Sequence, residues 1–164
     1  MALQFFDCIN SKFIRAVHYI VSQNNTAQNC AVTVFGGTQP TAAQIAASWS
    51  TYSAQYLVHW TNVLWFLPPA FTTLASSQVY NTQIPAGKAA FRSGTATWAI
   101  IWNRTNVSEA TIQGATLPSL TAGFTVVPVT NSGGNGVVRL TTTSIVSGTS
   151  YQPADITLRF GRAP

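Results

Sequence analysis

The sequence predicts a mainly β protein, an antiparallel β-sandwich or jelly-roll-like fold with one N-terminal amphipathic helix. Short alternating or β-branched runs recur through the second half of the chain, and turns rich in Gly, Ser and Pro separate them. Only residues 3–21 have a clear helical period. Strands with this spacing form a sandwich or jelly roll. Because the 164 residues contain no internal repeat, we expect one domain, residues 1–164, with the sandwich at about 31–161.

The first expected element is the helix at residues 3–21. Its apolar residues recur every three or four positions, and its basic residues lie on the opposite face. The apolar stripe is wide enough to pack on the chain's own sandwich. In the alternative, the first residues leave the domain as an arm that docks on a neighbour. The candidate interface residues of this segment are Phe5, Phe6 and Phe13.

A strand, a short helical stretch and an apolar segment follow in order. Residues 31–35 form a β-branched strand that a Gly-Gly pair ends. The alanine-rich residues 41–50 favour one or two helical turns, which Thr41 can cap. Residues 56–66 are too apolar to show a period, so we expect a buried strand ending at Trp60 and a second one after it.

The rest of the chain contains a long connection and then several strands. Prolines bracket a loop-rich insert at about residues 66–90, and such connections are usually functional or interface segments. Between two later strands the run NSGGNG indicates a hairpin tip, because Gly and Asn tolerate positive φ. The later strand candidates are residues 96–102, 111–113, 124–130, 137–143 and 155–160, the last with clean alternation of apolar and polar residues.

The chain carries few charges. Only 7% of its residues are charged, with a net charge of +5, against about a quarter in typical domains. The basic residues are scattered, whereas nucleic-acid binding needs a clustered basic face, so nucleic acid is not an expected partner. Surfaces with few charges are typical of β proteins that neighbouring subunits cover. The composition therefore predicts a subunit of an assembly, and a homo-oligomer.

The cysteines, histidines and N-terminal residues give no sign of a metal site or of export. Cys8 and Cys30 lack CxxC spacing, and two histidines are too few for a zinc site of normal spacing. We expect no metal, no cofactor and buried free thiols, with a Cys8–Cys30 pair left open. The first ten residues lack a basic signal-peptide start, and the longest apolar run, 63–71, is too short to span a bilayer. The sequence thus predicts a cytoplasmic product without a membrane partner.

The residue types that carry catalysis are sparse. Hydrolysis by general acid and base needs two carboxylates at a defined separation, and Glu109 and Asp155 are the only acids after Asp7. His59 has apolar neighbours, which favours a hydrogen-bonded, half-buried histidine over a base. The sequence contains neither a Gly-x-Ser-x-Gly elbow nor a phosphate-binding loop. We therefore predict no catalytic residues and no enzyme activity.

The five tryptophans divide into packing and binding candidates. Trp98 and Trp102 share one strand face, which is the pattern of a core or of an interface, so we take them as candidate interface residues. Aromatic side chains also stack on sugars. Trp60, Trp65 and Tyr80, in or beside the insert, are therefore the candidates for binding a partner or a glycan.

The order of these segments resembles a group of small tailed-bacteriophage structural proteins. The likeness lies in the helix INSKFIRAVHYIV, the strand and turn VFGGTQPTAA, the strand SGTATWAIIWN and the C-terminal VRLTTTSIVSGTSYQPADITLRF. It excludes the insert at about 66–90. The resemblance implies a non-enzymatic virion protein, made in the host bacterial cytoplasm, that binds capsid or tail subunits as a head decoration (cement) or as a tail or baseplate component. The alternative is a tail-tip or fibre module that binds carbohydrate or another receptor.

Overall fold

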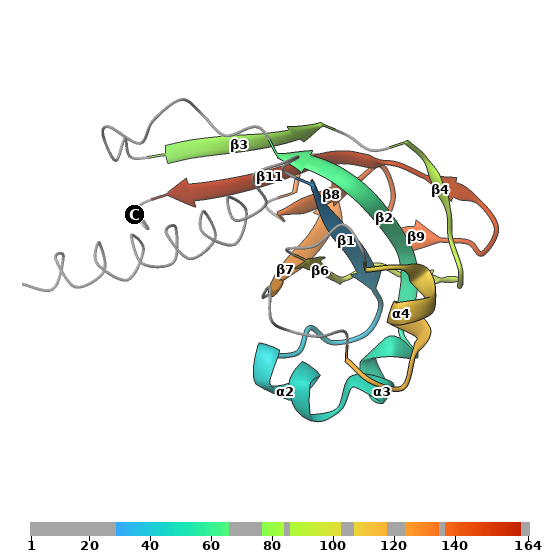
Figure 1. Cartoon of the computed structure of the whole chain (residues 1–164). Helices are drawn as coiled ribbons and strands as arrows, with labels where there is room; N and C mark the ends of the chain where they lie inside the picture. Colours follow the sequence, from blue (N-terminus) through green and yellow to red (C-terminus); the bar gives the residue numbers. More distant parts are fainter. Residues whose placement is uncertain are drawn as a thin grey trace, which may run out of the picture.

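The computed structural model of the chain describes residues 29–65, 77–83, 86–102, 107–117, 124–134 and 137–161. These residues confirm a mainly β protein with three short helices (Figure 1). The elements are β1 (Asn29–Phe35), α2 (Ala42–Ala47), α3 (Trp49–Ser53), β2 (Tyr56–Trp65), β3 (Ser77–Gln83), β4 (Lys88–Ala89), β5 (Gly94–Thr95), β6 (Trp98–Trp102), α4 (Glu109–Gln113), β7 (Phe124–Asn131), β8 (Val138–Leu140), β9 (Ser144–Ile145), β10 (Ser150–Tyr151) and β11 (Pro153–Gly161).

Seven strands close into one barrel in the order β1-β2-β3-β11-β8-β7-β6, and β6 pairs with β1 to complete the ring. A two-sheet sandwich or jelly roll is not confirmed, because these strands form one continuous sheet. Two small sheets, β10–β4 and β5–β9, lie outside this ring of pairing. In Figure 1, α2 and α3 lie together below the barrel, and α4 lies above α3 beside β2.

Strands β1 and β6 and the first half of β2, from Tyr56 to Trp60, are buried on both faces, which explains their sequences. All five side chains of β6 are buried, and so is every described side chain of β1 from Ala31 to Phe35. A strand covered on both sides has a nearly continuous apolar run instead of an alternating one. For the same reason residues 56–60 show no period, and residues 56–65 form the single strand β2 where two strands were expected.

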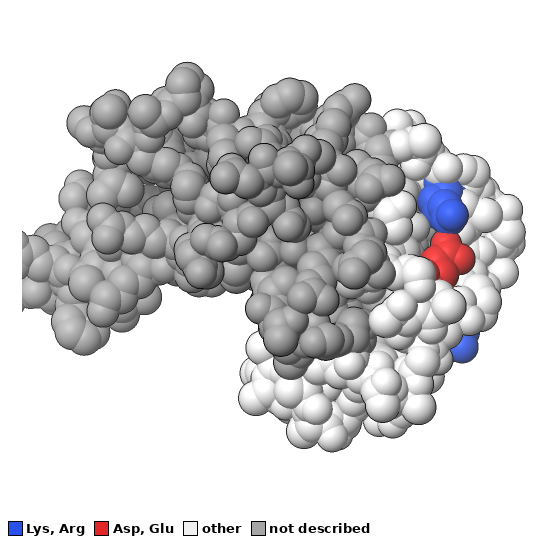
Figure 2. Space-filling model, in the orientation of Figure 1, with Lys and Arg blue, Asp and Glu red and all other residues white. Residues whose placement is uncertain are grey.

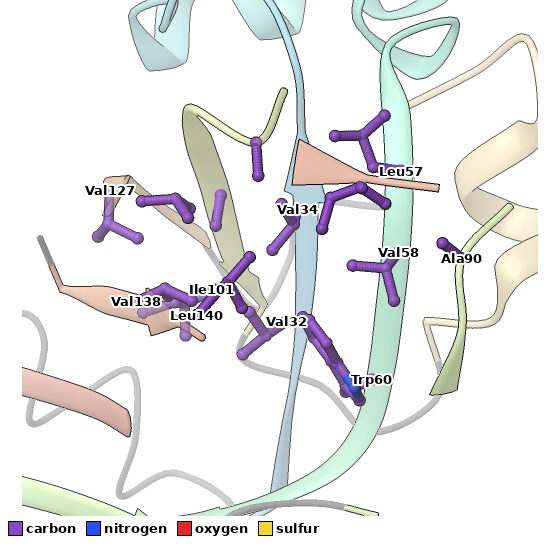
Figure 3. Close-up of a cluster of buried hydrophobic side chains, with 14 of the residues drawn as sticks. Val32, Val34, Leu57, Val58, Trp60, Ala90, Ile101, Val127, Val138 and Leu140 are labelled. Atoms are coloured by element: carbon purple, nitrogen blue, oxygen red, sulfur yellow. The ribbon is translucent and has the colours of Figure 1, made fainter. Parts of the chain in front are cut away.

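The two faces of these strands contribute to two separate apolar clusters. Figure 3 shows the first, the barrel core, in which side chains from facing strands point toward one another. The second, the aromatic layer, lies between the outside of the barrel and the helices. The barrel core includes Val32, Val34, Trp60, Ala99, Ile101 and Val127; the aromatic layer includes Phe35, Trp49, Tyr56, Trp98, Ile100, Trp102 and Ile112. The alternation predicted for β6 is therefore confirmed.

The short helices begin at side-chain caps. Thr41 caps α2 in a capping box with Gln44, which confirms the expected cap and helical turns. The strand expected at 111–113 is wrong, because these residues end the helix α4. Ser108 accepts a hydrogen bond from the Thr111 backbone N–H and starts that helix, and Ile112 is buried in the aromatic layer. Capping and one buried side chain thus outweigh the β propensity of Thr and Ile.

Strands β7 and β8 pair in parallel, with Val129 opposite Val138. The prediction that NSGGNG is the tip of an antiparallel hairpin is therefore wrong. Strand β8 runs in the same direction as β7, although the connection between them is far shorter than the usual crossover. Glycine permits this tight path: Gly133 has a φ of 99°, and a Cβ on Gly134 would lie 2.6 Å from Thr130 Oγ1.

Part of the expected insert belongs to the barrel. Strand β3 lies within residues 66–90 and pairs with both β2 and β11, so this stretch is not only a loop. The remaining predictions on the N-terminal segment fall outside the described residues, namely the helix at 3–21, the candidate residues Phe5, Phe6 and Phe13, and Cys8. None of the described helices is long and apolar enough to span a membrane.

Candidate functional site

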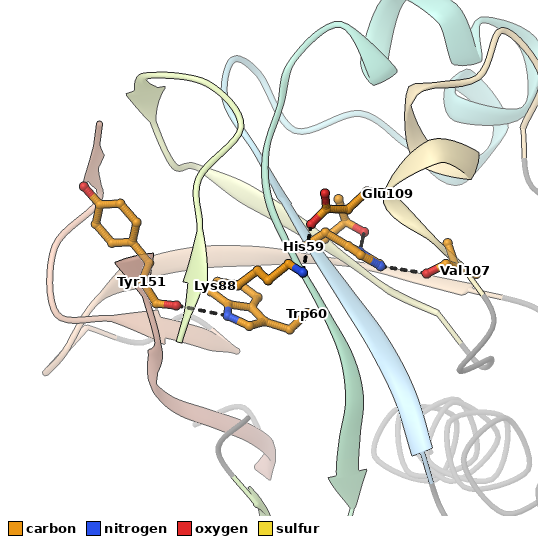
Figure 4. A network of polar contacts seen from close by, with 7 residues as sticks. His59, Trp60, Lys88, Val107, Glu109 and Tyr151 are labelled. Carbon is orange, nitrogen blue, oxygen red and sulfur yellow. Dashed lines mark hydrogen bonds and ion pairs between the residues drawn. The ribbon is translucent and has the colours of Figure 1, made fainter. Parts of the chain in front are cut away.

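A chain of hydrogen bonds joins three barrel strands to the segment before α4. On the outer face of the barrel, Trp102 Nε1 donates to Thr33 Oγ1 at 2.8 Å. The Thr33 hydroxyl lies 2.8 Å from His59 Nδ1, and His59 Nε2 lies 2.7 Å from the carbonyl oxygen of Val107. His59 is only 1% exposed. Figure 4 shows its ring between the barrel strands and Val107.

These contacts define the proton positions on His59. A carbonyl only accepts hydrogen bonds, so His59 Nε2 carries a proton and donates it to Val107. Thr33 accepts from Trp102 and donates its own proton to Nδ1, which leaves His59 neutral. Burial lowers the pKa of His59 below 6.5, and this effect exceeds the opposing influence of the Val107 carbonyl. His59 is thus a buried, fully hydrogen-bonded histidine and more deeply buried than expected.

Among the described acids, Glu109 lies close enough to His59 to raise the pKa of the histidine. Glu109 forms an ion pair with Lys88 at 3.5 Å on the partly exposed surface, as Figure 4 shows. Asp155 lies at the start of the β11–β8 pairing, opposite Arg139. Within the described ranges no group of three His, Cys, Asp or Glu side chains is placed to hold a metal ion.

The tryptophans with described side chains are buried within the chain itself. Trp98 is 0% and Trp102 3% exposed, and both indole nitrogens donate inside the protein, that of Trp98 to the Gly36 carbonyl at 2.8 Å. Of the two roles that their strand face allowed, a core or an interface, Trp98 and Trp102 therefore have the first: they pack inside the protein. Trp60 is 2% exposed, and its Nε1 donates to the Tyr151 carbonyl at 3.1 Å (Figure 4).

Burial removes Trp60 from the candidates for stacking on a sugar. The other two, Trp65 and Tyr80, are placed by their backbones alone. Trp65 pairs with Thr82 between β2 and β3, and Tyr80 pairs with Leu158 between β3 and β11. Trp65 thus pairs with β3, the strand that carries Tyr80, and Tyr80 is two residues from the Trp65 partner Thr82; Trp60 lies in the β1–β2 pairing.

A surface groove is the candidate binding site that the described residues do form. It has a volume of about 520 Å³, within the usual range of ligand sites. Its walls come from the β1–α2 turn, the α3–β2 junction and the residues around β5. The residues that line this groove, called the Arg92 groove below, are Gly36, Gly37, Ala54, Gln55, Leu57, Arg92, Ser93, Gly94, Thr95 and Thr97.

Two polar groups give the Arg92 groove its chemistry. Arg92 is exposed, donates from Nη1 to the carbonyl oxygen of Ala54, and lies 5.1 Å from the centre of the Phe91 ring. None of its contacts with other described residues is an ion pair. Gln55 Oε1 is buried and accepts no hydrogen bond. The groove thus combines a cation with an acceptor that lacks a donor.

Sequence reasoning missed this groove because its residues come from three separate segments. The available signals were the glycines of VFGG and RSGT. The barrel brings these two turns together, because a Cβ placed on Gly36 of the first turn would lie only 3.1 Å from the carbonyl oxygen of Thr95 in the second. Comparison with known proteins adds no further site: no protein-family model, no curated protein and no solved structure matches the chain.

Proposed function

We propose that the protein is a non-enzymatic structural protein of a tailed-bacteriophage virion. It acts as a small assembly subunit that binds neighbouring capsid or tail subunits and copies of itself, and it stabilises the particle from a place on the head, tail or baseplate. The barrel would serve as the rigid body of that subunit. The resemblance of its sequence segments to phage structural proteins supports this role.

One observation carries the proposal: the described surface has few charges and two large exposed apolar side chains on adjacent segments. Figure 2 shows Lys, Arg, Asp and Glu atoms at only a few places on the described face. Phe91 is 42% and Val146 54% exposed. Ser147, next to Val146, bonds to the Phe91 carbonyl at 3.0 Å and to Ser93 Oγ at 2.9 Å. These contacts place the two apolar residues on neighbouring loops.

The mechanism follows from this surface. Association is favoured when apolar side chains leave water, and a few anchors carry most of the binding free energy. Charged groups oppose association where they lose water without a partner, so a surface with few charges loses little on contact. A standard interface buries about 1,600 Å² in total, and repeated over many subunits it adds substantial cohesion to a particle.

The internal packing supports a structural role for the barrel. The ring of Phe35 stacks on Trp98 at 4.2 Å, and Trp49 meets Trp102 edge-on at 5.9 Å. Both ring nitrogens of His59 form hydrogen bonds within the fold. Among the described residues these groups stabilise the fold and leave the surface for association.

A binding experiment separates this function from the glycan-binding alternative. Light scattering gives the mass of the purified protein in solution, co-sedimentation with phage particles lacking it measures docking, and a glycan array measures sugar binding. We expect a stable oligomer or docking to particles, without a sugar signal. Sugar binding that is lost in Trp65→Ala or Tyr80→Ala, with the fold intact, would instead establish the receptor-binding alternative.

A further inference from the structure

We propose that the Arg92 groove binds an extended peptide segment of a neighbouring subunit, and that a carboxylate of this segment pairs with Arg92. The source of the peptide rests on the function proposed above. The chemistry of the groove does not, because it follows from the described side chains alone. Three features carry the inference: the glycine-lined walls of the groove, its two polar side chains and the apolar residues beside it.

Glycines allow the walls of the groove to pack closely. A Cβ on Gly37 would lie 2.6 Å from Gln55 Oε1, and one on Gly94 would lie 3.1 Å from Leu57 Cδ2. Any larger residue at these positions would therefore project into the space or displace a lining side chain. Gly37 also has a φ of 76°, a conformation that glycine adopts at little cost. The two glycines thus let Gln55 and Leu57 pack directly against the backbone of the groove wall.

The two polar groups of the groove are complementary to a ligand that has both a hydrogen-bond donor and an anionic group. The Arg92 guanidinium has five N–H donors in a planar fork, and its hydrogen bond to the Ala54 carbonyl uses a single nitrogen. A carboxylate matches this fork with two parallel hydrogen bonds. Gln55 also lines the groove, and its Oε1 is buried without a donor, which is costly; if the end of this side chain turns toward the groove, Oε1 can accept from an N–H or O–H of the ligand. A peptide provides both, an N–H from its backbone and a carboxylate from Asp, Glu or its C-terminus.

The edge of the groove adds apolar contact. Phe91 directly precedes Arg92, stacks on Tyr56 with ring centres 5.3 Å apart, and still leaves 42% of its surface exposed. Val146 lies on the adjacent loop, and it is 54% exposed. An apolar side chain of the bound segment can cover both, so the groove and the exposed apolar residues form one continuous docking surface.

Other anionic partners fit this site less well. Nucleic acid binds to clustered cations, whereas Arg92 is the one Lys or Arg among the groove-lining residues. A phosphodiester, as in nucleic acid, has acceptors but no O–H or N–H donor and would leave Gln55 Oε1 unpaired. A peptide carboxylate is therefore the partner whose chemistry matches both groups.

Nuclear magnetic resonance on the full ¹⁵N-labelled chain tests the proposal. The probe is the blocked tetrapeptide acetyl-Gly-Ala-Asp-Gly-amide, with the Asn version as its matched control; acetyl-Gly-Ala-Ala-Gly with a free C-terminus tests the other source of a carboxylate. We expect the amide signals of Gly37, Gly94 and Thr95 to shift with a dissociation constant in the millimolar range, and at least one carboxylate peptide to bind ten times more tightly than the Asn peptide.

Variants assign the binding to the two polar groups. Arg92→Gln should abolish the shifts, and Gln55→Met should weaken binding several-fold at unchanged charge. Lys88→Gln, which removes the same charge outside the groove, should leave binding unchanged. Shifts that are equal for Asp and Asn peptides, that persist in Arg92→Gln, or that inorganic phosphate or a short oligonucleotide reproduces would overturn the proposal, as would the absence of shifts.

The result is separable from the test of the proposed function. Peptide binding by a protein that does not dock to particles would leave the groove as a peptide site and overturn its assignment to a virion subunit. Docking to particles with unchanged affinity in Arg92→Gln would retain the virion function and overturn the role of the groove in it.

Discussion

The hydroxyl oxygen of Thr33 on β1 lies 2.8 Å from Nδ1 of His59 on β2. These two residues are also directly opposite in the pairing of the two strands. Trp102 donates to the same hydroxyl from β6, so one threonine connects the three strands on the outer face of the barrel. The segment before α4 joins this network through Val107.

The first prediction concerns the Thr33 hydroxyl. Thr33→Val keeps the shape of the side chain but leaves the Trp102 N–H and His59 Nδ1 without their partner, so the free energy of unfolding should fall by about 2–3 kcal/mol. Thr33→Ser keeps the hydroxyl and loses one methyl group, at a cost of about 1 kcal/mol. Urea unfolding followed by tryptophan fluorescence measures both. Equal losses would contradict the hydrogen-bond network.

The second prediction is the pH dependence of stability. His59 has a pKa below 6.5 in the folded protein, while in the unfolded chain it returns to about 6.5. Below pH 6.5 the unfolded state therefore binds more protons, and the free energy of unfolding should decrease by up to about 1.4 kcal/mol per pH unit down to the folded pKa. The Lys88–Glu109 ion pair nearby acts on this pKa with opposite signs.

The matched variant for that titration is His59→Gln, whose amide can still donate to Val107 but does not titrate. Subtracting its pH profile from that of the natural chain removes the contribution of His18 and of the carboxyl groups. The difference should decrease from pH 7 toward pH 5. A flat difference would show that His59 is not held neutral by the fold.

A third prediction separates packing from association for Trp98. This side chain is fully buried and stacks on Phe35, so Trp98→Ala should lower the free energy of unfolding by about 3–5 kcal/mol. Phe91→Ser, at an exposed site, should change stability by less than about 1 kcal/mol while weakening self-association or docking. Urea unfolding and light scattering measure the two effects. If Trp98→Ala instead weakened self-association or docking with little loss of stability, Trp98 would be an interface residue.

The fourth prediction compares two glycines with similar backbones. Gly37 has a φ of 76° and Gly148 one of 79°, so either change to Ala should cost about 1–2 kcal/mol through the backbone. A Cβ at Gly37 would also meet Gln55 Oε1, whereas one at Gly148 meets nothing within 4 Å. Because the end of the Gln55 side chain can move, only Gly37→Ala should change the NMR signals of the Arg92 groove. Equal effects there would contradict this geometry.

Local patterns in the sequence predict the elements whose causes are local. Thr41 and Gln44 are three residues apart and cap α2 as expected, and the β-branched run around Val32 forms β1. The alternation of Trp98 and Ala99 correctly assigns the two faces of β6. In each case the deciding interaction lies within a few residues.

Long-range pairing is what the sequence does not predict. The closure of the barrel through β6 and β1, and the parallel pairing of β7 with β8, depend on residues far apart or on an uncommon turn. From its sequence neighbours Trp60 is predicted to be a binding residue, whereas in the structure it lies in the barrel core. The Arg92 groove likewise exists only after three segments meet, because neither Arg92 nor Gln55 is distinctive in its own neighbourhood.

The most direct test of the central claim is the protein content of virions. Under the proposed function a phage encodes this chain. Gradient-purified particles of that phage can be analysed by quantitative mass spectrometry against the major capsid protein, and immunogold labelling then locates the protein on head or tail. We predict that the protein is present in a fixed, repeatable number of copies per particle. Its absence from purified particles, with abundant protein left in the infected cell, would contradict the claim.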